Sequence, residues 1–371
     1  MHANIYYLLI ILATHKISQN KKKKIISMNI VYIIGNGFDL RLGMPTSYPD
    51  FLAFYKYQEP VYDSTVREWK DRFFQIMKDK QRKGETEWRD LEIAIGQFTS
   101  SFTNNKQSFL DFYHDINYSL LKYLSEVERL VGNNFSQEEC DQLKSDLMSP
   151  YRYLNNREQN NCCKRLGYEN WYGNVISFNY TSSLEQLCKE SLEIGISYGR
   201  KDSSLTFQLN GIRHIHGELN KRAILFGLDN IEQISNKLFR EDEDILDILI
   251  KPRGNENIGS LIDTEAHDII QEADLICMFG TSLGPTDQTW WNYIKKRFME
   301  NISVTLLYFL YRSPAEGKPT LPMDNAPQRF ARKRVVEALG LDGEEKDYRD
   351  RIFVALNTEM FPKRNKQRVL L

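Results

Sequence analysis

The sequence lacks the cysteine patterns that indicate a disulfide framework or a structural zinc site. Its five cysteines include no CxxC pair and are odd in number, and the only adjacent two are Cys162 and Cys163. We therefore expect no zinc module, and we expect a reducing, cytoplasmic setting.

No apolar run is long enough to span a bilayer, which takes about 20 residues. The apolar stretch at residues 5–13 is short, and its lysines follow it, whereas a secretory signal carries its positive charge first. We interpret residues 1–27 as a leader or a mis-assigned start, because Met28 directly precedes the first expected strand. A weak attachment to a membrane surface is the less favoured alternative.

The sequence also lacks a strong net charge. Residues 1–27 hold five lysines and no acidic residue, so residues 28–371 carry 44 basic and 50 acidic side chains. A mildly acidic chain without a basic stripe argues against direct binding of nucleic acid. The hydrophobic content of 41% and the length of 371 residues favour one large folded domain with an insertion, or two domains.

The hydrophobic pattern predicts an α/β fold. A strand is expected at residues 29–34, followed at 48–165 by helical periodicity without a convincing strand. Short apolar segments then alternate with helical ones, with strands expected at 174–178, 205–210, 212–217, 223–227, 274–280, 303–311 and 351–357. This alternation indicates a mostly parallel sheet with helices on both faces. We expect residues 28–47 and 166–371 to form this domain and residues 48–165 to be a large helical insertion after its first strand.

Four polar clusters follow expected strands at their carboxyl ends. In an open α/β sheet, ligands bind in the crevice outside these ends. We therefore expect the clusters to share one site. They are Gly35-Asn36-Gly37, Asn179-Tyr180-Thr181, His216-Gly217 and Gly280-Thr281-Ser282.

The first cluster allows two interpretations. A G-x-G loop lets the backbone turn sharply and approach a ligand, and the N–H groups of a following helix favour an anion. However, Leu40 stands where the dinucleotide-binding fingerprint has its third glycine, so the loop alone is also compatible with a plain turn. Beside the other three clusters we favour a phosphate cradle that includes Phe38 and Asp39.

The polar side chains near the other clusters allow several roles. His216 is a candidate general base, and a zinc pair with His214 is less favoured because no third ligand appears at useful spacing. Asn179 is a candidate for orienting a water or a sugar hydroxyl, or else caps the helix that follows it. Asp287 either caps the next helix or accepts a hydrogen bond from ribose, and Glu92 is expected to be a solvated helix carboxylate.

The motifs together resemble a known family. The segments IIGNGFDLRLGMPTSYPDF, EWRDLE, SFNYT, HIHGE and GTSLGPTDQTWW, in this order, are similar to those of the bacteriophage abortive infection AbiH family. This resemblance covers nearly the whole chain from Met28 onward and implies a role in defence against phage.

The AbiH pattern in turn resembles sirtuin-like NAD-binding domains, which implies a Rossmann-like fold. Sirtuins carry a glycine loop running to a Gly-x-Pro turn, a catalytic Asn, a His-Gly pair and a late Gly-Thr-Ser, and the matching positions here are Gly35–Pro45, Asn179, His216-Gly217 and Gly280-Thr281-Ser282. The missing zinc module disfavours protein deacylation. The resemblance therefore implies NAD+ hydrolysis with Asn179 and His216 as catalytic residues and no metal.

Two other function classes remain open from the sequence. The chain is either a nucleotide sensor without turnover or, less favoured, a toxin acting on nucleic acid or translation. A lethal NAD+ hydrolase must be held inactive until a phage-derived trigger appears, so we expect the helical insertion to regulate it or to form a homo-oligomer.

Overall fold

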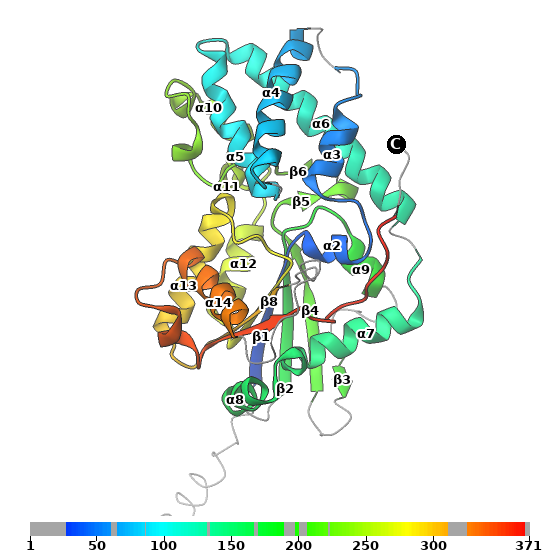
Figure 1. Ribbon diagram of the computed structural model, residues 1–371, viewed down its shortest axis with the longest axis vertical. Coiled ribbons are helices and arrows are strands. Elements are labelled where there is room, and N and C mark those ends of the chain that lie inside the picture. The colour runs from blue at the N-terminus through cyan, green and yellow to red at the C-terminus, as the bar shows by residue number, and fades with distance from the viewer. Residues whose placement is uncertain are drawn as a thin grey trace, which may run out of the picture.

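The computed structural model describes residues 27–60, 65–85, 87–131, 134–166, 170–188, 197–199, 206–221, 223–310 and 325–367. At its centre lies a seven-stranded sheet of order β3-β4-β2-β1-β7-β8-β9 (Figure 1). These strands are β1 Ser27–Ile34, β2 Asn170–Ser177, β3 Ser197–Gly199, β4 Thr206–His214, β7 Leu275–Phe279, β8 Thr305–Leu310 and β9 Ile352–Leu356.

The central strands are apolar throughout because both faces of the sheet are covered. All five residues of β7 are buried, and its alternate side chains enter two different hydrophobic cores. Parallel strands buried on both faces read as continuous apolar runs, which is why the sequence pattern located β7 so clearly.

The strand order has a topological switch point between β1 and β7. All neighbouring strands pair in parallel except β3 with β4. Numbered along the chain, the six parallel strands follow the order 3-2-1-4-5-6, which is the doubly wound order of dinucleotide-binding folds. The prediction of an α/β fold with a mostly parallel sheet is confirmed. Along the chain, strands are first added to one side of β1, and from β7 onward they are added to its other side.

The register aligns the carboxyl ends of four neighbouring strands. Ile34 of β1 lies opposite both Ser177 of β2 and Phe279 of β7, and Ser177 lies opposite His214 of β4. Each of the four polar clusters therefore begins within a few residues of these aligned strand ends.

Three helices cover one face of the sheet. They are α12 (Ile262–Gln271), α13 (Gln288–Glu300) and α14 (Ala326–Ala338), which lie to the left of the sheet in Figure 1. Their apolar faces, including Trp291 and Val335, pack on alternate residues of β1, β7 and β8.

The other face and the carboxyl-end edge of the sheet carry a larger group of helices. Between β1 and β2 the described residues form helices and no strand, as the periodicity predicts. These helices are α2 (Gly37–Arg41), α3 (Tyr48–Tyr55), α4 (Thr65–Arg82), α5 (Trp88–Phe98), α6 (Lys106–Val131), α7 (Gln137–Met148) and α8 (Asn156–Leu166). One hydrophobic core continues from the sheet into α3–α6, with an aromatic centre that includes Phe73, Phe98 and Phe112. The division of the chain into two domains stays a prediction.

The expected strand at residues 223–227 is wrong for the main sheet. Only Ala223–Ile224 form a strand, β6, which pairs with β5 (Gly217–Glu218) in a separate two-stranded sheet. The chain then turns away, since Leu228 exchanges backbone hydrogen bonds with Leu249 and Lys251 instead.

Other sequence expectations differ in extent. The segments 205–210 and 212–217 form the single strand β4, which ends at His214. Residues 230–250, where the sequence predicts a helical segment between two strands, form two short 3-10 turns followed by α10 (Glu243–Leu249), and α11 (Lys251–Asn257) comes next. After β2 the chain forms α9 (Ser183–Cys188). The expected leader lies outside the described residues except for its last position, and so does Tyr311 at the end of one expected strand. Among the described helices, none has the length and apolar character needed to cross a membrane.

Candidate active site

A cavity of about 430 Å³ lies at the carboxyl ends of the strands. Residues from the loops after β1, β2, β4 and β7 line it, and so do Trp88, Arg89 and Glu92 of α5. Eleven of the thirteen site residues expected from the sequence are in this lining: Gly35, Asn36, Gly37, Asp39, Asn179, Thr181, His216, Gly280, Thr281, Ser282 and Asp287.

The other two expected residues lie outside the cavity lining. The ring of Phe38 is fully buried and packs edge-on against Phe361, with 5.2 Å between ring centroids. Gly217 has a φ of +82°, and a Cβ there would lie 2.1 Å from the carbonyl oxygen of Ala223. Phe38 therefore belongs to the core, and Gly217 permits the tight pairing of β5 with β6.

The glycines of the loop after β1 allow it to pack closely against the loop after β7. A Cβ at Gly35 would lie 2.7 Å from the carbonyl oxygen of Gly280, and one at Gly37 would lie 2.5 Å from the Cα of Gly280. The N–H of Gly37 donates to Gly280 O at 3.0 Å, and the N–H groups of Gly35 and Phe38 donate to Phe279 O and Gly35 O. These three amides are thus already used, which corrects the expectation that they face outward toward an anion.

Replacing Gly280 with alanine is expected to destabilise the protein more than replacing Gly259. Both glycines have similar φ angles, +69° and +67°, so each alanine pays about 1–2 kcal/mol for the left-handed conformation. A Cβ at Gly280 would also lie 2.7 Å from the Cα of Gly37, whereas one at Gly259 would meet no atom within 4 Å. The overlap adds about 1–3 kcal/mol. Urea denaturation measures both variants, and equal losses would contradict the close approach of the two loops.

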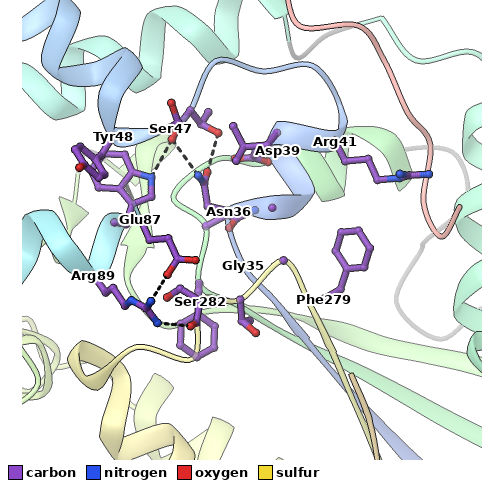
Figure 2. A pocket seen from close by; sticks show the side chains of 18 of the residues that line it. Gly35, Asn36, Asp39, Arg41, Ser47, Tyr48, Glu87, Arg89, Phe279 and Ser282 are labelled. Carbon is purple, nitrogen blue, oxygen red and sulfur yellow. Dashed lines mark hydrogen bonds and ion pairs between the residues drawn. The ribbon is translucent and has the colours of Figure 1, made fainter. Parts of the chain in front are cut away.

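Asn36 holds the next part of the chain in place. Its Nδ2 donates to Thr46 O at 3.1 Å, and its Oδ1 accepts from the Thr46 hydroxyl at 2.7 Å. The indole N–H of Trp88 also donates to the backbone carbonyl oxygen of Thr46, at 2.9 Å. Figure 2 shows how these contacts fix the wall formed by Asn36, Ser47 and Tyr48 beside α5.

Arg89 joins α5 to the loop after β7. Its Nη1 donates to Ser282 O at 2.7 Å, and its Nη2 lies 2.6 Å from a Glu87 oxygen (Figure 2). Three further cationic residues, Arg41, Lys363 and Arg364, also line the cavity. The site therefore has basic side chains near the glycine loop, although its backbone amides are engaged.

Two titratable groups clamp the loop after β2. Asp39 accepts hydrogen bonds from the hydroxyls of Thr181 (2.7 Å) and Ser183, and burial raises the pKa of Asp39 to about 6. His214 contacts Asn179 O at 2.8 Å and Glu185 at 2.7 Å. Burial opposes its protonation, but the contacts with Glu185 and Asn179 and the charge of Glu218 together outweigh burial and raise the pKa of His214. β4 ends at His214 and a turn follows it, so His214 and His216 do not share the face of one strand, as a zinc pair on that strand would need.

Asn179 points a buried oxygen into the site. Its side chain is 5% exposed, and its Oδ1 has no hydrogen-bond partner among the described residues. Since α9 begins at Ser183, Asn179 lies too far upstream to cap it, which rules out the capping interpretation. The hydroxyl of Thr281, also in the cavity lining, is likewise buried and unpartnered in the described structure.

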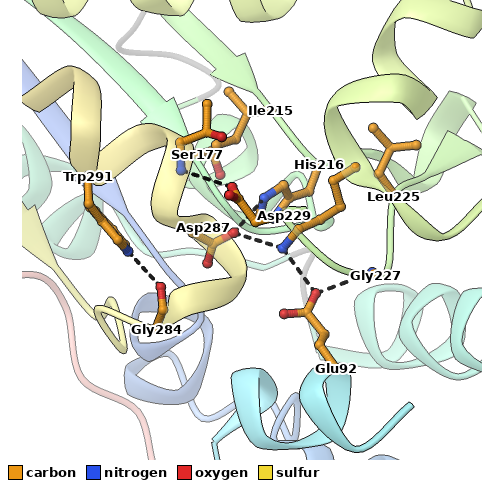
Figure 3. A network of polar contacts seen from close by, with 12 residues as sticks. Glu92, Ser177, Ile215, His216, Leu225, Gly227, Asp229, Gly284, Asp287 and Trp291 are labelled. Atoms are coloured by element: carbon orange, nitrogen blue, oxygen red, sulfur yellow. Dashed lines mark hydrogen bonds and ion pairs between the residues drawn. The ribbon is translucent and has the colours of Figure 1, made fainter. Parts of the chain in front are cut away.

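A buried ionic network extends from His216 to α5. Lys251 Nζ lies 2.8 Å from Asp287 Oδ1 and 3.2 Å from Glu92 Oε1 (Figure 3). His216 Nε2 lies 3.1 Å from the same Asp287 oxygen. Asp287 occupies the N-cap position of α13 without making the capping hydrogen bond, so its carboxylate serves the network.

The network separates the pKa values of its two carboxyl groups. Burial raises the pKa of Glu92 to about 7. Burial also opposes ionisation of Asp287, but Lys251 and His216 outweigh it and hold the pKa of Asp287 below its usual range. Burial together with the charge of Lys251 lowers the pKa of His216, which keeps the imidazole neutral near pH 7. Carboxyl groups separated in this way mark acid and base roles.

Sequence reasoning missed two members of the network. Glu92 was expected in solvent, yet it is 5% exposed. Its spacing from Trp88 and Ile95 places it on the inner face of α5, and this spacing was the sequence signal from which its burial could have been predicted. Lys251 directly follows the apolar residues 248–250, which is a weaker indication.

Metal ligation has no support in the described part of the chain. It contains no group of three or more His, Cys, Asp or Glu side chains placed to hold an ion.

Comparison with known proteins gives one family. The model of the family described as "Bacteriophage abortive infection AbiH" matches residues 31–308, which include every cavity residue discussed above except Lys363 and Arg364. No curated protein matches the chain.

Proposed function

Because the chain belongs to the AbiH family of abortive-infection proteins, which act in defence against bacteriophage, we propose that it hydrolyses the N-glycosidic bond of a nucleotide, with NAD+ as the first substrate to test. The site lies at the switch point of a doubly wound sheet, where such folds bind nucleotides. Its volume falls within the range of small-molecule sites, about 300–1,000 Å³.

The observation that carries this proposal concerns Asn179 and His216. His216 Nε2 lies 3.1 Å from Asp287 Oδ1, whereas two other polar atoms of the cavity lining, Asn179 Oδ1 and the Thr281 hydroxyl, are buried without a hydrogen-bond partner in the described structure. Asn179 and His216 both line the cavity, and the ring of Tyr180, adjacent to Asn179, lies 6.3 Å from the ring of His216. Buried polar groups normally find partners, so two exceptions in one cavity suit a water or ligand that they would bind.

The chemistry of NAD+ hydrolysis suits these groups. The nicotinamide of NAD+ is cationic and leaves as a neutral ring, so neither a metal nor a covalent nucleophile is required. Neutral His216 would take a proton from the attacking water, with Asp287 stabilising the imidazolium that results. Asn179 would hold the water or a ribose hydroxyl, and the hydroxyls of Thr281 and Ser282 would contact the ribose.

The motif pattern that is similar to sirtuin-like domains agrees with this proposal. In that alignment the catalytic Asn would correspond to Asn179 and the His-Gly pair to His216-Gly217, and both Asn179 and His216 line the cavity. For phosphate binding, the proposal relies on the cationic side chains of Arg41 and Arg89 instead of the amides of the glycine loop.

The test is release of nicotinamide from NAD+ by the purified full-length chain, alone and with extract of phage-infected cells. We expect release that Asn179→Ala reduces about 10²-fold or more. Asn236→Ala is the matched control, since Asn236 is similarly buried (9% exposed) but lies outside the cavity lining. Tight NAD+ binding without release under both conditions would instead establish a nucleotide sensor. A folded protein that neither binds NAD+ nor releases nicotinamide would reject the proposal.

A further inference from the structure

Glu92 and Asp287 share a single buried cation. Lys251 Nζ is 3.2 Å from Glu92 and 2.8 Å from Asp287, and the side chains of Lys251 and Glu92 are only 6% and 7% exposed. If both carboxyl groups were ionised, this buried group would carry a net negative charge. Burying an uncompensated charge is costly, so one carboxyl group is expected to keep its proton.

The contacts of the two carboxyl groups indicate which of them keeps its proton. Asp287 has the closer contact with Lys251 and also faces His216 at 3.1 Å. Glu92 has the longer contact with Lys251 and a weak hydrogen bond from the N–H of Gly227 at 3.4 Å. Asp287 is therefore the ionised member and Glu92 the protonated one, which agrees with the raised pKa of Glu92, about 7.

Glu92 and His216 reach the same cavity from different elements. Glu92 comes from α5 and His216 from the turn after β4, and both line the cavity on either side of the Lys251–Asp287 pair (Figure 3). The aromatic side chains of Trp88, Phe178 and Tyr180 line it as well and offer flat surfaces for a base. The site thus combines a proton donor, a neutral base and a place for an aromatic ring.

We propose that Glu92 is a catalytic acid that protonates a departing purine, and that the enzyme therefore cleaves purine ribonucleotides as well as NAD+. This inference rests on the proposed N-glycosidic hydrolysis. NAD+ needs no such donor, because its nicotinamide is already cationic. A purine is neutral in its nucleotide and leaves well only after a ring nitrogen has taken a proton.

The step balances as hydrolysis of a nucleotide to a free purine and a ribose phosphate. The C1′–N9 bond breaks and its electron pair goes to the purine, which receives the Glu92 proton on N7 or N3. The water oxygen bonds to C1′ while His216 takes a water proton. Exchange with solvent then returns a proton from His216 to Glu92.

Replacing Glu92 with glutamine separates the two substrate classes. The amide keeps the shape but cannot transfer a proton, so we expect adenine release from AMP, ADP and ATP to fall about 10²–10⁴-fold. Nicotinamide release from NAD+ should change less than about 10-fold, and Glu92→Asp should recover part of the adenine release. Glu158→Gln is the matched control, because Glu158 pairs with Arg332 at 3.3 Å outside the cavity.

The pH dependence gives a second way to distinguish the substrates. The groups facing Glu92 are Lys251 of α11, Asp287 before α13, Tyr113 of α6 and Tyr180. Burial raises the pKa of both tyrosines, so among these groups only Glu92 titrates near pH 7. Adenine release should therefore decline as the pH rises through about 7, and nicotinamide release should not.

Infrared difference spectroscopy tests the proton on Glu92 without relying on activity. Wild type minus Glu92→Gln should show the C=O stretch of a protonated carboxyl group below about pH 7, and its absence would overturn the inference. So would nicotinamide release by wild type without adenine release, or equal losses on both substrates in the variant. Failure of wild type to cleave either substrate would reject the proposed function itself and the inference with it.

Discussion

Replacing His216 with alanine is expected to lower nicotinamide release from NAD+ by about 10²–10⁴-fold while the protein stays folded. The imidazole is the neutral base that the cavity offers, because burial and Lys251 keep its pKa low and Asp287 lies 3.1 Å from its Nε2. The fold should survive, since Asp287 retains its 2.8 Å contact with Lys251. Kinetics with NAD+, paired with thermal unfolding of the same samples, measure both parts of this prediction.

The matched control for this variant is His267→Ala. His267 lies on α12, where it contacts Asp268 and stacks edge-on against Tyr293, and it does not line the cavity. Its loss should leave the rate unchanged. The rate of nicotinamide release by the wild type should decline only as the pH drops through the lowered pKa of His216. If His216→Ala kept the wild-type rate, His216 would have no part in the mechanism.

Replacing Lys251 with methionine is expected to cost about 3–5 kcal/mol of unfolding free energy near pH 8. The change leaves Asp287 and Glu92 buried without their cation, and an unpaired buried charge is the most costly outcome of breaking an ion pair. Lys106→Met is the control, because Lys106 also contacts two carboxylates, Asp242 and Asp244, but on the surface. That change should cost less than about 1 kcal/mol. Urea denaturation compares the two variants.

The cost of losing Lys251 should shrink as the pH falls from about 8 to about 6. Without the cation, both carboxyl groups have folded-state pKa values above their unfolded ones, so proton uptake favours the folded state at lower pH. A second replacement, Asp287→Asn, should recover part of the lost stability in the Lys251→Met background for the same reason. Equal costs for Lys251→Met and Lys106→Met, independent of pH, would show that the network is not a buried ionic unit.

The sequence predicted the edge of the sheet better than the contacts that form on it. Strands such as β7 are apolar on both faces, and that pattern needs no knowledge of partners. Polar residues directly after such strands share an edge once the strands are parallel, so Asn179 and His216 were expected together, and the cavity contains both.

The roles of individual residues depended on contacts that periodicity does not reveal. Gly37 was expected to free amides for a phosphate, but its missing Cβ makes room for Gly280, which is 243 residues away in the chain. Glu92 and Lys251 are 159 residues apart, so their pairing was not visible from local sequence. The inward spacing of Glu92 on α5 was visible and was outweighed by the general tendency of glutamate to face solvent.

The most direct test of the account is a crystal structure of the His216→Ala protein with bound NAD+. We predict that the nicotinamide ribose lies against Asn179 and position 216, with the glycosidic bond facing the water site between them and the phosphates near Arg89 or Arg41. Nucleotide bound away from the carboxyl ends of β1 and β7, or with its adenine end at Asn179 and its nicotinamide in solvent, would contradict the account.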